Sequence, residues 1–172
     1  VLVTKPKALL LDEPLGDLDR LLQLRMRVEL RRLQRQLGLM FVHVTHNQEE
    51  ALSMADRIVV MNDARIQQVA DPLTIATRPR NELVARFMGD NNILTGTVVE
   101  QAGDRLVLEH SGGVRVSVRG SSPAQVGEQT QVAVRAAAVE IAGEGQAADG
   151  LNVVQCEIVF VEFLGDLVKL HL

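Results

Sequence analysis

A short apolar run, residues 8–11, leads directly into two adjacent carboxylates, Asp12 and Glu13. A continuously apolar segment of this kind is typical of a strand that is buried on both faces of a parallel sheet. Charged side chains are rarely buried unless they are paired or bind a cation. The junction therefore indicates a strand that ends at a functional site, where a metal ion, a phosphate or a catalytic step accounts for the two acids.

Strands and helices alternate over the first half of the chain. After the acids, apolar residues recur at spacings of three and four, which predicts an amphipathic helix that ends at Gly38. Asn47 and Glu50 have the spacing of a capping box at the start of a second helix. The predicted order is a helix over 19–38, a strand over 39–46, a helix over 48–57, a third strand over 57–63 with a hairpin partner over 64–70, and two short helices over 72–88. This alternation predicts a parallel sheet covered by helices.

Beyond Gly89 the hydrophobic period changes from that of a helix to that of a strand. Short segments of alternating apolar and polar residues are separated by turn sequences such as "AGD" and "SGG". These segments cover residues 93–101, 105–110, 114–119, 130–142 and 152–172. The spacing predicts a small antiparallel barrel or sandwich. We therefore expect two domains, at residues 1–90 and 91–172.

Composition excludes several classes of protein. The net charge is −4, with 13 basic against 12 acidic residues in positions 1–90 and 5 against 10 in positions 91–172. Because the chain has no basic stripe, no Trp and no Tyr, we expect no nucleic-acid partner. The single cysteine, Cys156, forms no internal disulfide, and no apolar run reaches the ~18 residues of a membrane span. We expect a chain of the reducing cytosol that is free to dock on a membrane protein.

The acids have a specific chemical interpretation. An Asp at the carboxyl end of a parallel strand helps to hold Mg²⁺ in P-loop NTPases, and an adjacent Glu is placed to act as general base. His46 ends the next predicted strand, so it is expected to reach the same phosphate as Glu13. An ordinary strand-to-turn junction is the alternative explanation for Asp12. A metal pair of His43 with His46 is disfavoured, because within one strand these side chains point to opposite faces.

Three stretches, "LLLDEPLGDLD", "VTHNQEEALSMADRIVVMNDARIQQV" and "RNELVARFMGDNNILTGTV", resemble the ATP-binding subunits of ABC importers, and among them the polyamine, sugar and ferric-iron import group. The resemblance implies an α/β fold. Residues 1–90 would form an incomplete P-loop NTPase-type parallel sheet with helices. Residues 91–172 would form a small all-β OB-like barrel domain of the TOBE type, truncated within the barrel.

The resemblance also implies roles for four residues. Asp12 would end the Walker B strand and hold Mg²⁺, and Glu13 would be the catalytic base. Asp19 would be the last residue of the D-loop, which crosses to the partner subunit, and would help to bind the nucleotide. His46 would be the switch histidine that contacts the γ-phosphate of ATP.

Two family motifs are absent from the sequence. No G-x-x-x-x-G-K-[ST] phosphate loop occurs, and we interpret Ser-Gly-Gly at residues 111–113 as a hairpin turn and not as the signature helix, because it lies between two predicted strands. The Ser-Ala usual in the family's D-loop is replaced by Gly16 and Asp17. We therefore expect a C-terminal portion of the subunit, inactive by itself, with ATP and Mg²⁺ bound only by the intact protein. The missing motifs have two possible explanations, which the sequence does not distinguish: the chain is a fragment of the subunit, or it is the product of a degenerate gene.

The implied function is to power solute import from the cytoplasmic face of the inner membrane. The partners would be a second copy of the subunit, forming a homodimer, and transmembrane permease subunits. A polyamine is the preferred solute, with sugar, ferric iron or another solute as alternatives. A non-catalytic regulatory or dimerisation fragment is the alternative from a different class. A soluble ABC-type ATPase that acts on DNA is disfavoured by the acidic second half.

Overall fold

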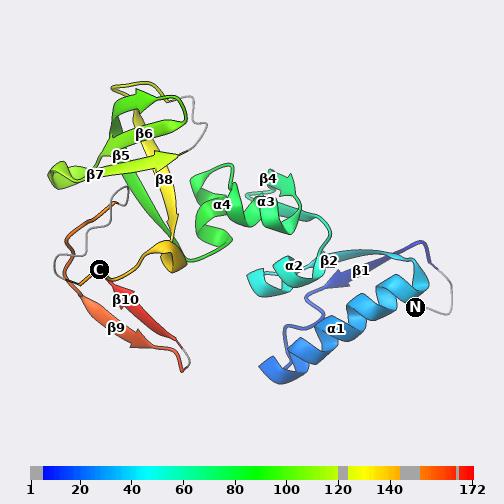
Figure 1. Cartoon of the computed structure of the whole chain (residues 1–172). Coiled ribbons are helices and arrows are strands. Elements are labelled where there is room, and N and C mark those ends of the chain that lie inside the picture. Colours follow the sequence, from blue (N-terminus) through cyan, green and yellow to red (C-terminus); the bar gives the residue numbers. More distant parts are fainter. Residues whose placement is uncertain (1–5, 120–123, 144–151, 166) are drawn as a thin grey trace. The chain divides into compact units, whose positions relative to one another are not determined.

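The computed structural model describes residues 6–119, 124–143, 152–165 and 167–172 (Figure 1). The chain divides into two compact units, Val1–Asn92 and Ile93–Leu172. Residues 1–5 of the first predicted domain, and 120–123, 144–151 and 166 of the second, lie outside the described residues. Among the helices described, none is both long and apolar enough to cross a membrane.

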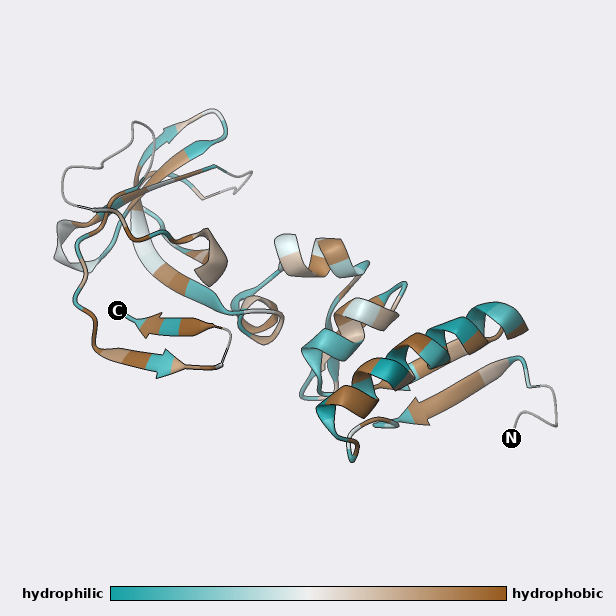
Figure 2. Cartoon of the chain, turned by 60° about the horizontal axis from the view of Figure 1, so that its bottom comes forward, coloured by the Kyte–Doolittle hydropathy of each residue, from teal (hydrophilic) through white to brown (hydrophobic). Residues whose placement is uncertain are grey.

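The first unit begins with a β-α-β crossover. Strands β1 (Ala8–Asp12) and β2 (Met40–Val44) pair in parallel and are joined by α1 (Arg20–Leu37), which runs alongside the sheet in both views (Figures 1 and 2). As the sequence predicted, α1 ends at Gly38, whose φ of 61° is in the left-handed region that glycine adopts without strain.

The prediction that the first strand is buried on both faces was wrong for the described residues. Alternate side chains of β1 and β2 are half-buried, and the intervening ones are exposed. The exposed apolar side chains are Leu10, Met40, Val42 and Val44, at 76%, 66%, 45% and 56%. Figure 2 shows β1 coloured as hydrophobic, although nothing in the described part of the chain covers its second face.

A hairpin and three short helices complete the first unit. They are α2 (Gln48–Met54), β3 (Ile58–Asn62), β4 (Arg65–Ala70), α3 (Pro72–Thr77) and α4 (Glu82–Phe87). The alternation of elements predicted that the third strand joins the parallel sheet, and this was wrong: among the described strands β3 pairs only with β4. The two-residue turn Asp63 and Ala64 has positive φ at both positions, 48° and 57°, as a tight type I′ hairpin requires, and such a turn favours pairing with the nearest strand in sequence.

The core of the first unit lies where β3 meets the short helices. Its buried side chains are Ile58, Val60, Ile75, Val84 and Met88. Three small or aliphatic residues of α2 and its C-terminus, Ala51, Leu52 and Ala55, pack against this cluster. Helix α2 is therefore held by the same core as α3 and α4, which fixes the segment that follows β2.

The described part of the second unit contains strands and two single-turn 3₁₀ segments. Strands β5 (Asn91–Ala102), β6 (Arg105–Glu109), β7 (Arg115–Arg119) and β8 (Gln129–Arg135) form one sheet in the order β7-β6-β5-β8. The predicted turn at residues 111–113 is confirmed as the link between β6 and β7. Gly96 leaves room for the β6 backbone, because a Cβ there would lie 2.9 Å from the carbonyl oxygen of Glu109.

The last predicted strand segment, residues 152–172, is only partly regular. Strands β9 (Phe160–Phe163) and β10 (Val168–His171) form an antiparallel hairpin, whereas residues 152–159 form neither helix nor strand. Asn152 instead bonds through its side chain to both the N–H and the C=O of Ser117 on β7, at 2.6 and 2.7 Å. A side-chain amide thus takes the place of the backbone ladder that the period-2 pattern predicted.

The core assignment of the first unit predicts a contrast within α3. Ile75 is fully buried, whereas Leu73, two positions earlier, is 72% exposed. Ile75→Ala should lower the free energy of unfolding by about 2–5 kcal/mol, because it removes buried apolar contacts and leaves a cavity. Leu73→Ala should change it by no more than about 0.5 kcal/mol. Urea denaturation followed by circular dichroism measures both, and equal losses would contradict the assigned core.

Candidate functional site

The parallel pairing of β1 with β2 brings the predicted site residues to one end of the sheet. Asp12 pairs with Val44 in the register, and the N–H of Glu13 donates to the carbonyl oxygen of Val44 at 2.9 Å. His46 follows β2 by two positions, and its Nδ1 lies 2.9 Å from Oε1 of Glu13. The expectation that Glu13 and His46 converge is therefore met across 33 positions of sequence.

Glu13 has an unusual backbone conformation. Its φ of 42° lies in the left-handed region, which a residue with a Cβ rarely adopts. The N–H of Gly16 donates to the carbonyl oxygen of Glu13 at 3.2 Å and closes the turn that begins there. Strained residues of this kind concentrate at functional sites, because surrounding structure must hold them in place. The strain supports a functional interpretation of Glu13 over an ordinary strand-to-turn junction.

The Glu13–His46 pair is exposed and mutually stabilising. The side chains of His46 and Glu13 are 74% and 51% exposed. The hydrogen bond and the negative charge of Glu13 raise the pKa of His46 above its ordinary value, with a smaller contribution from the charge of Glu50. Because the folded-state pKa is raised, the contact stabilises the fold below the unfolded-state pKa of about 6.5. That contribution is lost as the pH rises through the folded-state pKa of His46.

Asp12 and Asp19 are not part of the Glu13–His46 contact. Asp12 is exposed at the end of β1, beside Glu13. The Oδ1 of Asp19 accepts the N–H of Leu22 at 3.0 Å and caps the N-terminus of α1. In the described part of the chain no hydrogen bond joins Asp19 to Glu13 or His46. Capping alone is a sufficient structural reason for an Asp at position 19.

The donor set at this edge fits Mg²⁺ only as part of a larger site. Magnesium is usually held in proteins by one or two carboxylates together with water and substrate phosphates, and an exposed carboxylate such as that of Asp12 is a suitable ligand of this type. Among the described residues no group of three or more His, Cys, Asp or Glu side chains comes together.

Sequence reasoning missed a buried network behind His46. Glu50 is only 4% exposed, and its carboxylate lies between His43 on β2 and Thr45 at the end of that strand. The spacing of Asn47 and Glu50 pointed only to a capping box, and one half of it is present: the side chain of Asn47 accepts the N–H of Glu50. The other half is replaced, because the side chain of Glu50 turns toward β2.

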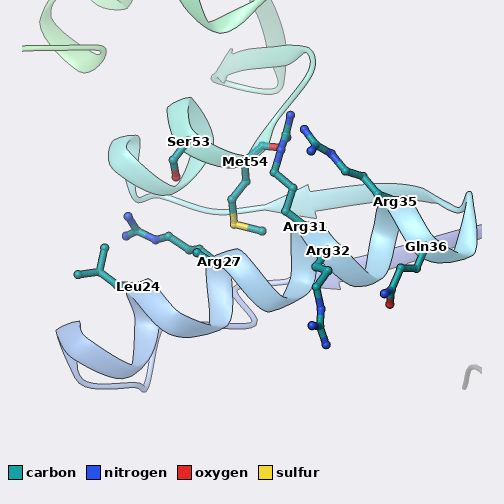
Figure 3. A pocket seen from close by; sticks show the side chains of 9 residues that line it. Leu24, Arg27, Arg31, Arg32, Arg35, Gln36, Ser53 and Met54 are labelled. Carbon is teal, nitrogen blue, oxygen red and sulfur yellow. The ribbon is translucent and has the colours of Figure 1, made fainter.

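A separate groove of about 530 Å³ runs between α1 and α2 (Figure 3). Arg27 lies 3.7 Å from Glu49, while Arg31 bonds to the carbonyl oxygen of Met54 and, at 3.1 Å, to Asp56. These contacts join the two helices, and the residues lining the groove include none of the four predicted site residues. The groove therefore reflects how α2 is fixed against α1, and the candidate site lies at the end of the sheet.

Comparison with known proteins gives a consistent group of relatives. The chain is 50% identical over 167 residues to the spermidine/putrescine import ATP-binding protein PotA of Rubrobacter xylanophilus, covering 95% of this chain and 43% of that protein. Proteins of the same name from Vibrio parahaemolyticus and Thermobifida fusca are 47% and 53% identical over 77% and 65% of the chain. The chain is homologous to the ATP-binding subunits of ABC importers.

This homology confirms the resemblance to import ATP-binding subunits that was read from the sequence, and all three relatives carry the name of a spermidine/putrescine import ATP-binding protein. No family model matches the chain. The chain spans less than half the length of the curated relatives that it matches, at 43%, 35% and 29% for these three. The assignments of individual site residues are not tested by the homology and stay predictions.

The site geometry predicts a measurable titration. Glu13→Gln keeps the shape of the side chain but removes its charge, so the pKa of His46 should fall toward its ordinary value. Histidine ring NMR of the 172-residue chain measures this directly. Glu49→Gln is the matched control, because Glu49 pairs with Arg27 and not with His46. An unchanged His46 titration in Glu13→Gln would contradict the pairing.

Proposed function

We propose that the chain is part of the ATP-hydrolysing subunit that powers solute import by an ABC transporter, with a polyamine as the solute. The observation that carries the proposal is the Glu13–His46 contact at the carboxyl end of a parallel strand pair, in a chain homologous to import ATP-binding proteins. A general base next to a histidine, at the sheet edge where α/β proteins bind ligands, is suited to hydrolysing a phosphoanhydride bond. Sugar, ferric iron or another solute are the alternatives within the same class.

Within this proposal Asp12 holds Mg²⁺ and Glu13 acts on the attacking water. The exposed carboxylate of Asp12 would hold Mg²⁺, which would supply positive charge to the nucleotide phosphates. One oxygen of Glu13, Oε1, is engaged by His46. The second oxygen, Oε2, is then the acceptor that orients a water molecule and takes its proton.

His46 supplies a donor to the terminal phosphate. An ionised carboxylate only accepts hydrogen bonds, so Nδ1 of His46 must donate to Glu13. Its Nε2 then carries a proton only when the ring is positively charged. The raised pKa of His46 increases the fraction of molecules in that state, in which Nε2–H donates to an anionic oxygen. Glu13 therefore prepares His46 for phosphate as well as serving as base.

The remaining assignments follow the same homology. Asp19, besides capping α1, lies in the segment that we assign to the D-loop, which crosses to a second copy of the subunit in a homodimer. The strand-rich second unit is proposed as the TOBE-type, OB-like domain of the importer group, and the first unit as an incomplete P-loop NTPase-type sheet. The intact subunit is proposed to bind transmembrane permease subunits at the cytoplasmic face of the inner membrane, as a peripheral protein.

The alternative of a non-catalytic regulatory or dimerisation fragment is less well supported. The relatives cited above carry the name of an import ATP-binding protein. A catalytic site also accounts for the contact of Glu13 with His46 at the end of the strand pair.

In the longer protein, Glu13→Gln should lower ATP turnover by at least ~10²-fold, because general-base catalysis contributes about 10²–10⁴-fold. ATP affinity should stay near normal, since most phosphate contacts in this class come from the phosphate loop. Steady-state hydrolysis beside nucleotide titration measures the two separately.

Substitutions of Asp12 and His46 should have effects that differ from those of Glu13→Gln, because the three residues have different proposed roles. Asp12→Asn should weaken Mg²⁺-dependent ATP affinity together with turnover, because it removes a charged metal ligand. His46→Ala should lower turnover and leave Mg²⁺ dependence near normal. Near-normal turnover in Glu13→Gln would show that the base is another residue.

The 172-residue chain by itself should not hydrolyse ATP. Its sequence has no phosphate loop to supply the backbone N–H donors and the lysine that bind the nucleotide phosphates. Phosphate release from the purified chain is the measurement, with Glu13→Gln as the control for contaminating activity. Turnover that disappears in Glu13→Gln would contradict this prediction.

A further inference from the structure

His46 lies in the short connection between β2 and α2, and hydrogen bonds fix the residues before and after it. Thr45, immediately before it, donates its hydroxyl to Oε2 of Glu50 at 2.6 Å, and the same hydroxyl oxygen accepts the N–H of Asn47 at 3.0 Å. Asn47, immediately after His46, accepts the N–H of Glu50 at 3.1 Å. The residues that flank His46 are thus bonded to each other and to Glu50, while His46 itself projects into solvent.

Glu50 is fixed to β2 as well as to this connection. Its Oε1 lies 2.8 Å from Nε2 of His43, and the two groups form an ion pair only when the imidazole is protonated. Both side chains are largely buried. A buried carboxylate keeps its charge only when its surroundings compensate for lost hydration, so these partners determine where the side chain of Glu50 lies.

Helix capping does not explain this arrangement. In a capping box the acid at the third helical position bonds back to the N–H of the N-cap residue. Here the N–H of the N-cap residue, Asn47, is satisfied by Thr45, and the carboxylate of Glu50 is directed to the end of β2 instead. The carboxylate of Glu50 therefore binds the segment that holds His46.

We propose that Glu50 is a positioning residue for His46: through Thr45 it fixes the turn so that Nδ1 of His46 stays within hydrogen-bond distance of Oε1 of Glu13. The contact at 2.9 Å joins residues that follow two different strands, so it requires a defined path for the chain between β2 and α2. The catalytic meaning of this positioning rests on the proposed function, whereas the positioning itself concerns this chain alone.

Two pairs of variants test the proposal in the 172-residue chain. Thr45→Val removes the hydroxyl but keeps the shape, and Thr45→Ser keeps the hydroxyl. Glu50→Ala removes the anchor, and Glu50→Gln keeps an oxygen that accepts the Thr45 hydroxyl. The readouts are histidine ring NMR for the titration of His46 and hydrogen exchange for the amide of Asn47.

Thr45→Val and Glu50→Ala should lower the pKa of His46 toward its ordinary value, because the contact with Glu13 is lost. Amide exchange at Asn47 should become about fivefold faster or more in Thr45→Val, as expected for one hydrogen bond of ordinary net strength. Thr45→Ser should stay close to the parent chain, and Glu50→Gln should lower the pKa of His46 only by the smaller contribution that the charge of Glu50 makes. Glu49→Gln, an exposed acid one position earlier in α2, is the charge control and should leave His46 unchanged.

An unchanged titration of His46 in folded Thr45→Val and Glu50→Ala would overturn the proposal. Loss of the dispersed spectrum in both variants would also overturn it, in favour of a general structural role for Glu50. The experiment needs no nucleotide, so its result is independent of whether the longer protein hydrolyses ATP.

Discussion

The parallel pairing of β1 with β2 is the interaction on which the candidate site depends. The register that places Asp12 opposite Val44 continues for one further hydrogen bond, from the N–H of Glu13. That bond holds the left-handed turn at Glu13 against the end of β2, where the chain leads to His46. Because side chains alternate along a strand, a register shift of one residue would separate the acid from the histidine.

The exposed face of the same strand pair is consistent with a chain that works as part of a longer protein. A parallel sheet is ordinarily covered on both faces, and Leu10 and Met40 are 76% and 66% exposed here. The curated relatives are more than twice as long as the matched region. We infer that further residues of a longer protein cover this apolar face and supply the phosphate contacts that the roles proposed for Asp12 and Glu13 require.

Local features of the fold were predictable from the sequence, whereas the number of strands in the parallel sheet was not. The spacing of apolar residues and Gly38 gave α1, and turn residues gave the hairpins, because these signals depend on near neighbours in sequence. The third strand pairs with its own hairpin partner instead of joining the parallel sheet, which periodicity does not encode. The convergence of Glu13 with His46 followed from the rule that neighbouring parallel strands end at one sheet edge. The direction of the Glu50 carboxylate could not be predicted from the sequence, because it depends on how α2 packs against β2.

The central claim is that the end of β1 and β2 is where ATP is bound and hydrolysed. The most direct measurement is a crystal structure of the longer protein, as the Glu13→Gln variant with ATP and with Mn²⁺ in place of Mg²⁺, in which anomalous scattering locates the metal. The account predicts the metal beside the carboxylate of Asp12 and Nε2 of His46 within hydrogen-bond distance of the terminal phosphate. A metal and nucleotide bound away from this edge of the sheet would contradict it.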